Sequence, residues 1–274
     1  MPAMQTVQLG EARIPRMGMG TWNLGRTAAE REQAALALRM GIEMGLSLVD
    51  TAEMYENESF LGTVLHPCRE QVYLVSKVLP HHADRRGTVA ACEASLRRLQ
   101  TDYLDLYLLH WQGEVPLEES VAAFQALQAA GKIRAWGVSN IDTAGMKTLP
   151  DVARCATNQV LYNPQYRAAE YDLLPWMAQQ RMPLMAYSPL GQGGTLLQHP
   201  TLTAVAEAHA ATPAQVVLAW LLTRPAVIPI PKAGNAAHLR ENVGAFHLQL
   251  TPADLAAIDT AFPRPRKKMP LVAW

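Results

Sequence analysis

The sequence has few cysteines and no spacing that would pair them. Its 274 residues include three, Cys68, Cys92 and Cys155, and no Cys-x-x-Cys motif. An odd number of widely spaced cysteines gives no disulfide framework and no zinc knuckle. We therefore expect three reduced, mostly packed thiols, as is typical of a cytoplasmic protein.

The chain also lacks an excess of charge of one sign. Lysine and arginine together number 24, aspartate and glutamate together number 24, and the formal net charge is zero. Binding to nucleic acid requires a basic face that neutralises phosphates, so this balance argues against a nucleic-acid partner. A small local basic pocket is still compatible with it.

A long uninterrupted apolar run is missing as well. The most apolar stretch, residues 213–231, is broken by Gln215, Arg224 and four prolines. It therefore indicates a buried helix, a turn and a strand rather than the ~20 apolar residues that span a bilayer. The first 13 residues have neither the basic nor the apolar segment of a signal peptide. These features predict a cytoplasmic protein without a membrane partner.

The composition provides enough apolar material for a large core. Hydrophobic residues make up 49% of the chain and charged residues 18%, which excludes global disorder. At ~150 residues per domain the length fits two domains, but one α/β barrel of ~250 residues fits equally well. Because no linker-like change in composition divides the chain, we expect a single domain over residues 1–274.

Short apolar runs alternate with longer amphipathic segments. Most runs are continuous rather than alternating, as expected for parallel strands covered on both faces. Eight strand–helix units of about 30 residues each suit a (β/α)8 TIM barrel better than an open sheet. The predicted strands are Arg16–Gly20, Leu46–Val49, Val72–Ser76, Leu104–Leu109, Ile133–Val138, Thr157–Val160, Pro183–Tyr187 and Ala226–Ile230.

Helix signals and one hairpin complete the predicted barrel. Apolar residues recur at helical spacing at 89, 92, 96 and 99, and again at 117, 121, 124 and 127. Thr212 and Thr251 each precede a proline and, two residues further on, Gln215 or Asp254, which predicts two capped helix starts. Near the N-terminus, the segment 7–14 with Gly10 at its turn predicts a hairpin that closes the barrel bottom.

Several familiar motifs are incomplete in this chain. Gly18-Met-Gly20 lacks the third glycine of a dinucleotide fingerprint. The segment 81–84, His-His-Ala-Asp, is favoured as a solvated loop, because adjacent side chains diverge too much to bind one metal ion. Tyr73 and Lys77 have the Tyr-x3-Lys spacing of short-chain dehydrogenases, but in a strand they lie ~13 Å apart. We therefore predict no metal site and no open-sheet dinucleotide fold.

The most informative residues are those directly after each predicted strand. Alone, Asp50 would be a helix cap, Lys77 a solvated strand end and His110 a satisfied core histidine. In a (β/α)8 barrel, however, catalytic groups gather at the carboxyl ends of the strands. Polar or aromatic residues stand at nearly every such end, which predicts a site at this rim: Gly20-Thr21-Trp22, Asp50, Lys77, His110, Ser139-Asn140, Gln159, Tyr187-Ser188 and Lys232.

Seven segments occur in order along the chain: DTAEMY (50–55), VSK (75–77), LLHW (108–111), GVSN (137–140), NQ (158–159), AYSPLG (186–191) and IPK (230–232), the last followed by Glu241-Asn242. Over nearly the whole chain they resemble the aldo-keto reductases. The stretches around residues 48–55, 75–78 and 94–111 look most like small bacterial members of the methylglyoxal-reductase kind. The resemblance implies an NADP(H)-dependent barrel enzyme that reduces carbonyl groups.

The resemblance implies a catalytic tetrad of Asp50, Tyr55, Lys77 and His110. The chemistry has its own logic, because a free tyrosine has a pKa of ~10 and is a poor acid at neutral pH. An adjacent Lys77 ammonium would stabilise the phenolate and lower that pKa, and Asp50 would keep Lys77 charged. A neutral His110 would polarise the substrate carbonyl. Tyr55 is then the general acid in reduction.

The resemblance also implies the cofactor contacts. Lys232 would face the 2′-phosphate, and His238 stands where many relatives carry arginine, which would weaken the preference for NADP(H) over NAD(H). Glu56 replaces a common glycine after Tyr55. The expected contacts are Gly20, Thr21, Trp22 and Asp50 at the first strands, Ser139, Asn140 and Gln159 at the carboxamide, Tyr187 on the nicotinamide ring, Ser188, Leu190 and Gln192 along the pyrophosphate, and Lys232, Ala233, Asn235, His238, Glu241 and Asn242 around the adenosine.

For the substrate, we expect Trp22 and Trp111 to wall an apolar slot beside Tyr55 and His110, with Trp274 or Tyr166 as further neighbours. No residue is an evident clamp for a carboxylate or a phosphate. Small reactive aldehydes such as methylglyoxal are therefore the expected substrates of a monomeric enzyme. Two alternatives remain, a redox-sensing regulatory subunit that binds the cofactor with little turnover, and an unrelated barrel that binds a phosphorylated substrate.

Overall fold

The computed structural model describes residues 4–273 and begins with a hairpin. Strands β1 (Thr6–Leu9) and β2 (Ala12–Pro15) pair antiparallel. Gly10 in the turn has a φ of +59°, and a Cβ there would lie 3.0 Å from the Cβ of Ala135. Both the left-handed backbone and the close approach favour glycine. The predicted hairpin is therefore confirmed, and its Leu9 carbonyl accepts a hydrogen bond from Tyr73 Oη at 3.3 Å.

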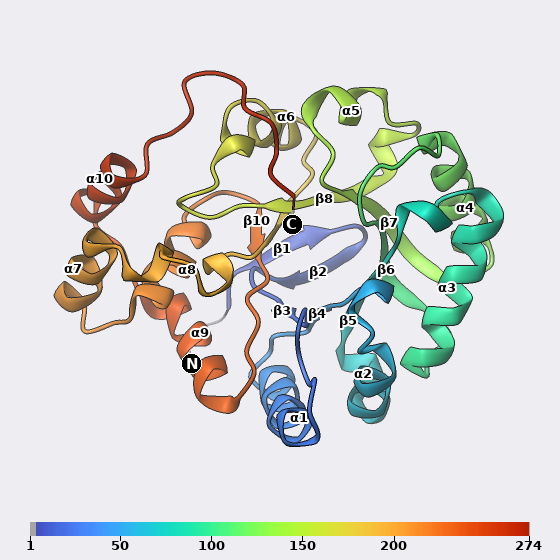
Figure 1. Cartoon of the computed structure of the whole chain (residues 1–274), viewed down its shortest axis with the longest axis horizontal. Helices are drawn as coiled ribbons and strands as arrows, with labels where there is room; N and C mark the ends of the chain where they lie inside the picture. Colours follow the sequence, from blue (N-terminus) through green and yellow to red (C-terminus); the bar gives the residue numbers. More distant parts are fainter. Residues whose placement is uncertain (1–3, 274) are drawn as a thin grey trace.

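Eight further strands form one parallel sheet that closes into a barrel (Figure 1). The sheet order follows the chain order. The barrel closes because the N–H groups of Gly18 and Gly20 donate to the carbonyls of Pro229 and Pro231, each at 3.0 Å. The predicted (β/α)8 barrel is confirmed. Its strands are β3 (Met19–Gly20), β4 (Leu48–Asp50), β5 (Tyr73–Val78), β6 (Leu104–Leu109), β7 (Ile133–Ser139), β8 (Cys155–Leu161), β9 (Leu184–Tyr187) and β10 (Val227–Pro229).

Helices surround the barrel, as Figure 1 shows in a view with the hairpin at the centre. The α-helices are α1 (Ala28–Glu43), α2 (Glu58–Leu65), α3 (Arg85–Leu99), α4 (Leu117–Ala129), α5 (Thr143–Thr148), α6 (Leu173–Gln179), α7 (Pro200–Ala208), α8 (Pro213–Leu222), α9 (Ala236–Gly244) and α10 (Pro252–Ala261). Short 3₁₀ helices cover Glu53–Tyr55, His66–Gln71, Pro80–His82, Val152–Arg154, Ala168–Glu170, Gly191–Gly193, Leu196–Gln198 and Ala245–His247. None of the helices within residues 4–273 has the length and apolar character needed to cross a bilayer.

The two predicted helix caps are confirmed. Thr212 accepts from the N–H of Gln215, and the Gln215 side chain accepts from the N–H of Thr212, which forms a reciprocal capping box at the start of α8. Thr251 and Asp254 do the same at the start of α10. Such caps satisfy N–H groups that a helix leaves unpaired at its first turn.

Alternation along the strands sends successive side chains to two separate cores. Leu48, Val75, Leu106, Leu108, Met185, Ile228 and Ile230 pack inside the barrel with Leu9 and Ile14 of the hairpin, whereas their strand neighbours pack outward against the helices. Because side chains alternate with period two, Asp50 shares the inner face with Leu48, Lys77 with Val75, and His110 with Leu108. The inner face therefore carries apolar residues below and reactive residues at the carboxyl end.

The strand boundaries differ from prediction by up to three residues. The strand expected at 46–49 begins at Leu48, because the N–H of Leu46 bonds back to the carbonyl of Gly41 at 2.8 Å and belongs to the end of α1. Asp50 is the last residue of β4, and Lys77 lies within β5 rather than after it. Strand β3 covers only the last two residues of the predicted Arg16–Gly20. After α10 the chain is irregular, and it returns to the barrel mouth, where the Val272 carbonyl lies 3.5 Å from Tyr187 Oη.

Candidate active site

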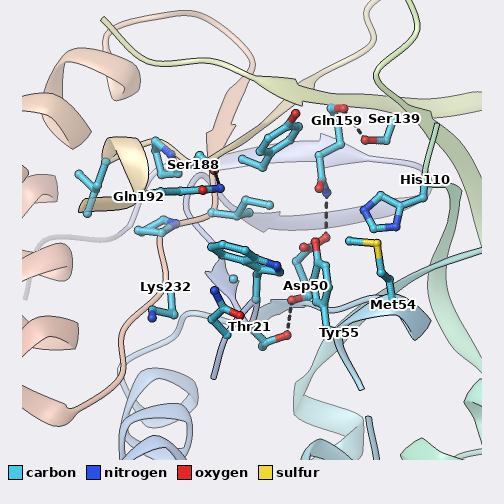
Figure 2. A pocket seen from close by; sticks show the side chains of 18 of the residues that line it. Thr21, Asp50, Met54, Tyr55, His110, Ser139, Gln159, Ser188, Gln192 and Lys232 are labelled. Carbon is cyan, nitrogen blue, oxygen red and sulfur yellow. Dashed lines mark hydrogen bonds between the residues drawn. The ribbon is translucent and has the colours of Figure 1, made fainter. Parts of the chain in front are cut away.

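A cavity of about 620 Å³ opens at the carboxyl ends of the strands (Figure 2). In Figure 2, Asp50, Tyr55 and His110 lie toward one end of the residues drawn, and Ser188, Gln192 and Lys232 toward the other. The cavity is lined by Gly20, Thr21, Trp22, Asn23, Asp50, Met54, Tyr55, His110, Ser139, Asn140, Gln159, Tyr187, Ser188, Pro189, Leu190, Gln192, Gly193, Leu197, Ile230, Pro231 and Lys232.

The Lys77 ammonium lies at the centre of the reactive end and is completely buried. Its Nζ donates to Asp50 Oδ2 at 2.7 Å, to the Thr51 carbonyl at 2.8 Å and to Tyr55 Oη at 3.3 Å. A buried cation needs such partners, because removal from water otherwise costs several kcal/mol. The structure thus brings three of the four predicted tetrad residues into direct hydrogen-bond contact.

Burial and charge have opposing effects on the pKa of Lys77 and on the pKa of Tyr55. Burial lowers the pKa of Lys77, but Asp50 and Tyr55 together raise it by more, so Lys77 remains an ammonium. Burial raises the pKa of Tyr55, and the Lys77 charge lowers it by less than burial raises it. Lys77 does lower the pKa of the phenol, as expected, but this effect is smaller than that of burial. The net shift is upward, because the burial of the phenol outweighs the effect of the Lys77 charge.

His110 is the fourth member of the predicted tetrad. It follows β6, and its ring meets the Tyr55 ring edge-on, with centroids 5.8 Å apart. Burial, assisted by the Lys77 charge, lowers the pKa of His110 to about 3. The imidazole is therefore neutral at physiological pH. Nδ1 is buried and has no hydrogen-bond partner among residues 4–273. Since orphaned buried N–H groups are rare, this favours the proton on Nε2.

Tyr55 stands on a short turn rather than on a regular strand or helix. It ends the 3₁₀ helix Glu53–Tyr55, and the next residue, Glu56, has a φ of +54°. This left-handed backbone explains why a glycine is the easier residue after Tyr55. Asn57 secures the far side of the turn, donating to the Thr21 carbonyl at 2.7 Å and accepting from Thr51 Oγ1 at 2.9 Å.

The residues expected at the carboxamide form a hydrogen-bonded row. Gln159 Nε2 donates to Asp50 Oδ1 at 2.8 Å, and Ser139 Oγ donates to the Gln159 carbonyl at 2.7 Å. Asn140 donates to the His110 carbonyl at 3.1 Å and accepts from Tyr187 Oη at 3.0 Å. These bonds fix polar side chains beside the Tyr187 ring. Such an arrangement suits a flat ring that carries an amide.

The residues expected around the adenosine divide into two groups. Lys232 lines the cavity and is exposed. His238 is exposed in the first turn of α9, where its N–H donates to the side chain of the N-cap residue Asn235 at 2.9 Å. Asn235 and His238 do not line the cavity. Ala233, Glu241 and Asn242 lie outside the lining as well, and Glu241 accepts from Thr212 Oγ1 at 2.6 Å.

The comparisons with known proteins agree with this geometry. The aldo/keto reductase family model matches residues 16–262. The chain belongs to the aldo/keto reductase family. It is 50% identical over 272 residues to methylglyoxal reductase YeaE of Escherichia coli, with 96% of each chain covered. It is 36% identical to glyoxal reductase of Bacillus subtilis, with 90% of this chain and 88% of the relative covered.

Solved structures of other aldo/keto reductases superimpose closely. An aldo-keto reductase from Klebsiella pneumoniae, crystallised in complex with NADPH, is 47% identical, with a TM-score of 0.96 over 99% of this chain and 100% of the other. A second crystal structure from Klebsiella pneumoniae, with NADP and acetate, has a TM-score of 0.95 at 47% identity, over 98% of this chain and 99% of the other. An unrelated barrel that binds a phosphorylated substrate is excluded by the family match.

Sequence reasoning missed part of the lining of this aldo/keto reductase and included residues outside it. The missed residues are Asn23, Met54, Pro189, Gly193, Leu197, Ile230 and Pro231. Met54 had one usable signal, its position next to Tyr55. Trp111 packs against His110, with ring centroids 4.9 Å apart, but neither it nor Tyr166 lines the cavity. Trp274 lies outside the described residues.

Proposed function

We propose that this aldo/keto reductase reduces small uncharged aldehydes and dicarbonyls such as methylglyoxal, with NADPH as the hydride donor and Tyr55 as the general acid. One observation carries the proposal. The buried Lys77 joins Asp50 to Tyr55 at the carboxyl end of the barrel, and a neutral His110 lies beside them. Strand ends of this kind are where barrel enzymes hold their chemistry.

The donor set of the cavity fits NADP(H). Ser139, Asn140 and Gln159 supply polar groups beside Tyr187, as a carboxamide-bearing ring requires. At the other end, Lys232 offers a cation and the start of α9 carries His238, which together suit a 2′-phosphate. NADPH, when bound, supplies the hydride that the carbonyl carbon accepts. The complex of the Klebsiella pneumoniae relative with NADPH supports the same assignment.

The chain's own residues then handle the proton. His110 donates a hydrogen bond to the carbonyl oxygen and stabilises its developing negative charge. Tyr55 gives its hydroxyl proton to that oxygen, so that the carbonyl becomes an alcohol and the tyrosine a phenolate. Lys77 stabilises this phenolate, and Asp50 holds Lys77 in place. A proton from solvent restores Tyr55 for the next turnover.

The substrate class follows from the charges at the reactive end. Among the described lining residues, Lys232 is the one permanent cation at the cavity surface, and Figure 2 places it at the end away from Tyr55 and His110. Lys77 is closer, but it is buried and its hydrogen bonds are taken. Trp22 and Met54 are 42% and 39% exposed at the mouth. This surface favours a small substrate without a carboxylate or a phosphate.

The chain would act as a monomeric, single-domain enzyme of the cytoplasm. The alternative is a regulatory subunit that binds the cofactor to sense redox state and turns over little. A panel of aldehydes with NADPH and NADH, following the absorbance of the reduced cofactor, separates the two. Rapid turnover of methylglyoxal and similar aldehydes by the isolated chain supports the enzyme. Tight NADPH binding without turnover of any aldehyde would support the sensor.

A further inference from the structure

The Tyr55 turn is attached to the loop after β5 by the carboxylate of Glu53. Glu53 Oε1 accepts from the N–H of Leu79 at 2.6 Å, and His82 Nδ1 lies 3.2 Å from the same oxygen. Glu53 opens the 3₁₀ helix that ends at Tyr55, and Leu79 is two residues after Lys77. One carboxylate thus joins the turn that carries the phenol to the loop that directly follows the strand with the ammonium.

We infer that Glu53 is a positioning residue, which holds the Tyr55 phenol against Lys77, and that His82 supports it. The inference rests on the proposed function, because it concerns the proton donor of that reaction. No substrate atom needs to touch Glu53. Its side chain is only 9% exposed and is directed toward Leu79 and His82.

On the side of Glu53, the backbone before the turn is held at Thr51, whose carbonyl accepts from Lys77, and Glu53 adds the side-chain contact of the turn itself. On the far side, Asn57 bonds to the Thr21 carbonyl and to Thr51. The intervening backbone is a single 3₁₀ turn, in which the N–H of Tyr55 donates to the Ala52 carbonyl at 3.0 Å and the N–H of Glu56 to the Glu53 carbonyl at 3.3 Å. Glu53 and Asn57 therefore anchor the turn two residues before and two residues after Tyr55. Without Glu53, the side-chain anchor before Tyr55 is lost.

The contact that this anchor protects tolerates little displacement. Tyr55 Oη lies 3.3 Å from Lys77 Nζ, near the long limit of a hydrogen bond. A shift of the turn by about 1 Å would break this contact, and misplacement on that scale lowers rates by up to ~100-fold. The bond from the Leu79 N–H is charge-assisted because its acceptor is a carboxylate. A glutamine at 53 keeps an acceptor oxygen for Leu79 without the charge.

The test compares Glu53→Ala, Glu53→Gln and His82→Ala in the parent and in a Tyr55→Phe background. We measure kcat for a small aldehyde, the Kd for NADPH and the Tm. Glu53→Ala should lower kcat by about 10- to 100-fold with the Kd for NADPH within about twofold. Glu53→Gln should retain most of the activity, and His82→Ala should lose about two- to fivefold. In the Tyr55→Phe background, Glu53→Ala should cause no further loss, because the positioned group is already absent.

The matched control is Asp254→Ala, which removes another carboxylate–imidazole contact, at 2.8 Å from His209, on a different side of the barrel. It should lower the Tm and leave kcat unchanged. An equal loss of kcat from Glu53→Ala in both backgrounds, or an unchanged kcat in the parent background, would overturn the inference. If Glu53→Ala does not fold, the same comparison with His82→Ala decides. A parent without turnover, or an unaffected Tyr55→Phe variant, would instead overturn the proposed function and the inference with it.

Discussion

Replacing Lys77 by methionine removes the charge from the centre of the site while keeping most of the side-chain volume. The ammonium has three oxygen partners within 3.3 Å, and none of them can bond to a thioether as it does to an N–H donor. The Asp50 carboxylate, 3% exposed, would keep Gln159 Nε2 as a partner but lose its counter-ion. The variant therefore tests stability and catalysis together.

The stability effect follows from the buried pair. Breaking a buried ion pair by removing one partner typically costs about 3–5 kcal/mol, because an uncompensated charge remains. The hydrogen bond from Gln159 to Asp50 offsets part of this cost, so we expect the free energy of unfolding to decrease by an amount near the lower end of that range. Lys132→Met is the control, since Lys132 pairs with Glu93 at the surface, where both side chains are more than one-third exposed. It should leave the free energy of unfolding nearly unchanged, because an exposed ion pair contributes little.

The catalytic effect follows from the pKa of Tyr55. Burial already raises this pKa and the Lys77 charge opposes the rise, so Lys77→Met raises the pKa further and makes the phenol a weaker acid. Because general acid catalysis contributes roughly 10²–10⁴-fold, kcat for reduction should fall by an amount in that range. Alcohol oxidation needs the phenolate, so its pH profile should move to higher pH.

The assays are steady-state reduction of an aldehyde at a temperature where each variant is folded, NADPH titration and denaturant unfolding. The Kd for NADPH should stay close to that of the parent. A folded Lys77→Met enzyme with full activity and an unshifted pH profile would show that Lys77 is a structural residue only.

Two further predictions concern the histidines. The pKa of His110 in the folded protein is about 3, below the ordinary value of ~6.5, so the unfolded chain binds more protons between these two pH values. The contribution of the neutral His110 to the free energy of unfolding should therefore be fully present above pH ~6.5 and decrease as the pH falls toward 3. Denaturant unfolding of the parent and of His110→Gln across this range should show a shallower decline in the variant, and parallel curves would contradict the prediction. His238→Arg should tighten NADPH binding more than NADH binding, because arginine is permanently charged and grips a phosphate with two donors. Equal effects on both cofactors in calorimetric titrations would indicate that residue 238 does not face the 2′-phosphate.

The barrel was predictable because local signals and the global pattern agree. Continuous apolar runs indicated buried parallel strands, and the threonine–proline starts at 212 and 251 both form capping boxes. The predicted strand boundaries were less accurate, because strand ends depend on hydrogen bonds that the pattern of apolar residues does not reveal. Leu46 is as apolar as Leu48, but its N–H is taken by the carbonyl of Gly41.

The reactive end of the site was also largely predictable. Asp50, Tyr55 and Lys77 meet at hydrogen-bond distance, and His110 lies beside them. The net direction of the Tyr55 pKa shift was not predictable, because it depends on the balance between the burial of the phenol and the Lys77 charge. The full lining was not predictable either, since loop conformation decides that Met54 faces the cavity and Trp111 does not.

The kcat of Tyr55→Phe, measured together with its Kd for NADPH, decides whether Tyr55 is the proton donor. The substitution removes one hydroxyl, which is the proposed proton donor, and leaves the ring in place. A fall in kcat of roughly 10²–10⁴-fold with an unchanged Kd is the predicted result. A variant that retains more than half of the parent kcat would contradict the assignment of Tyr55 as the acid.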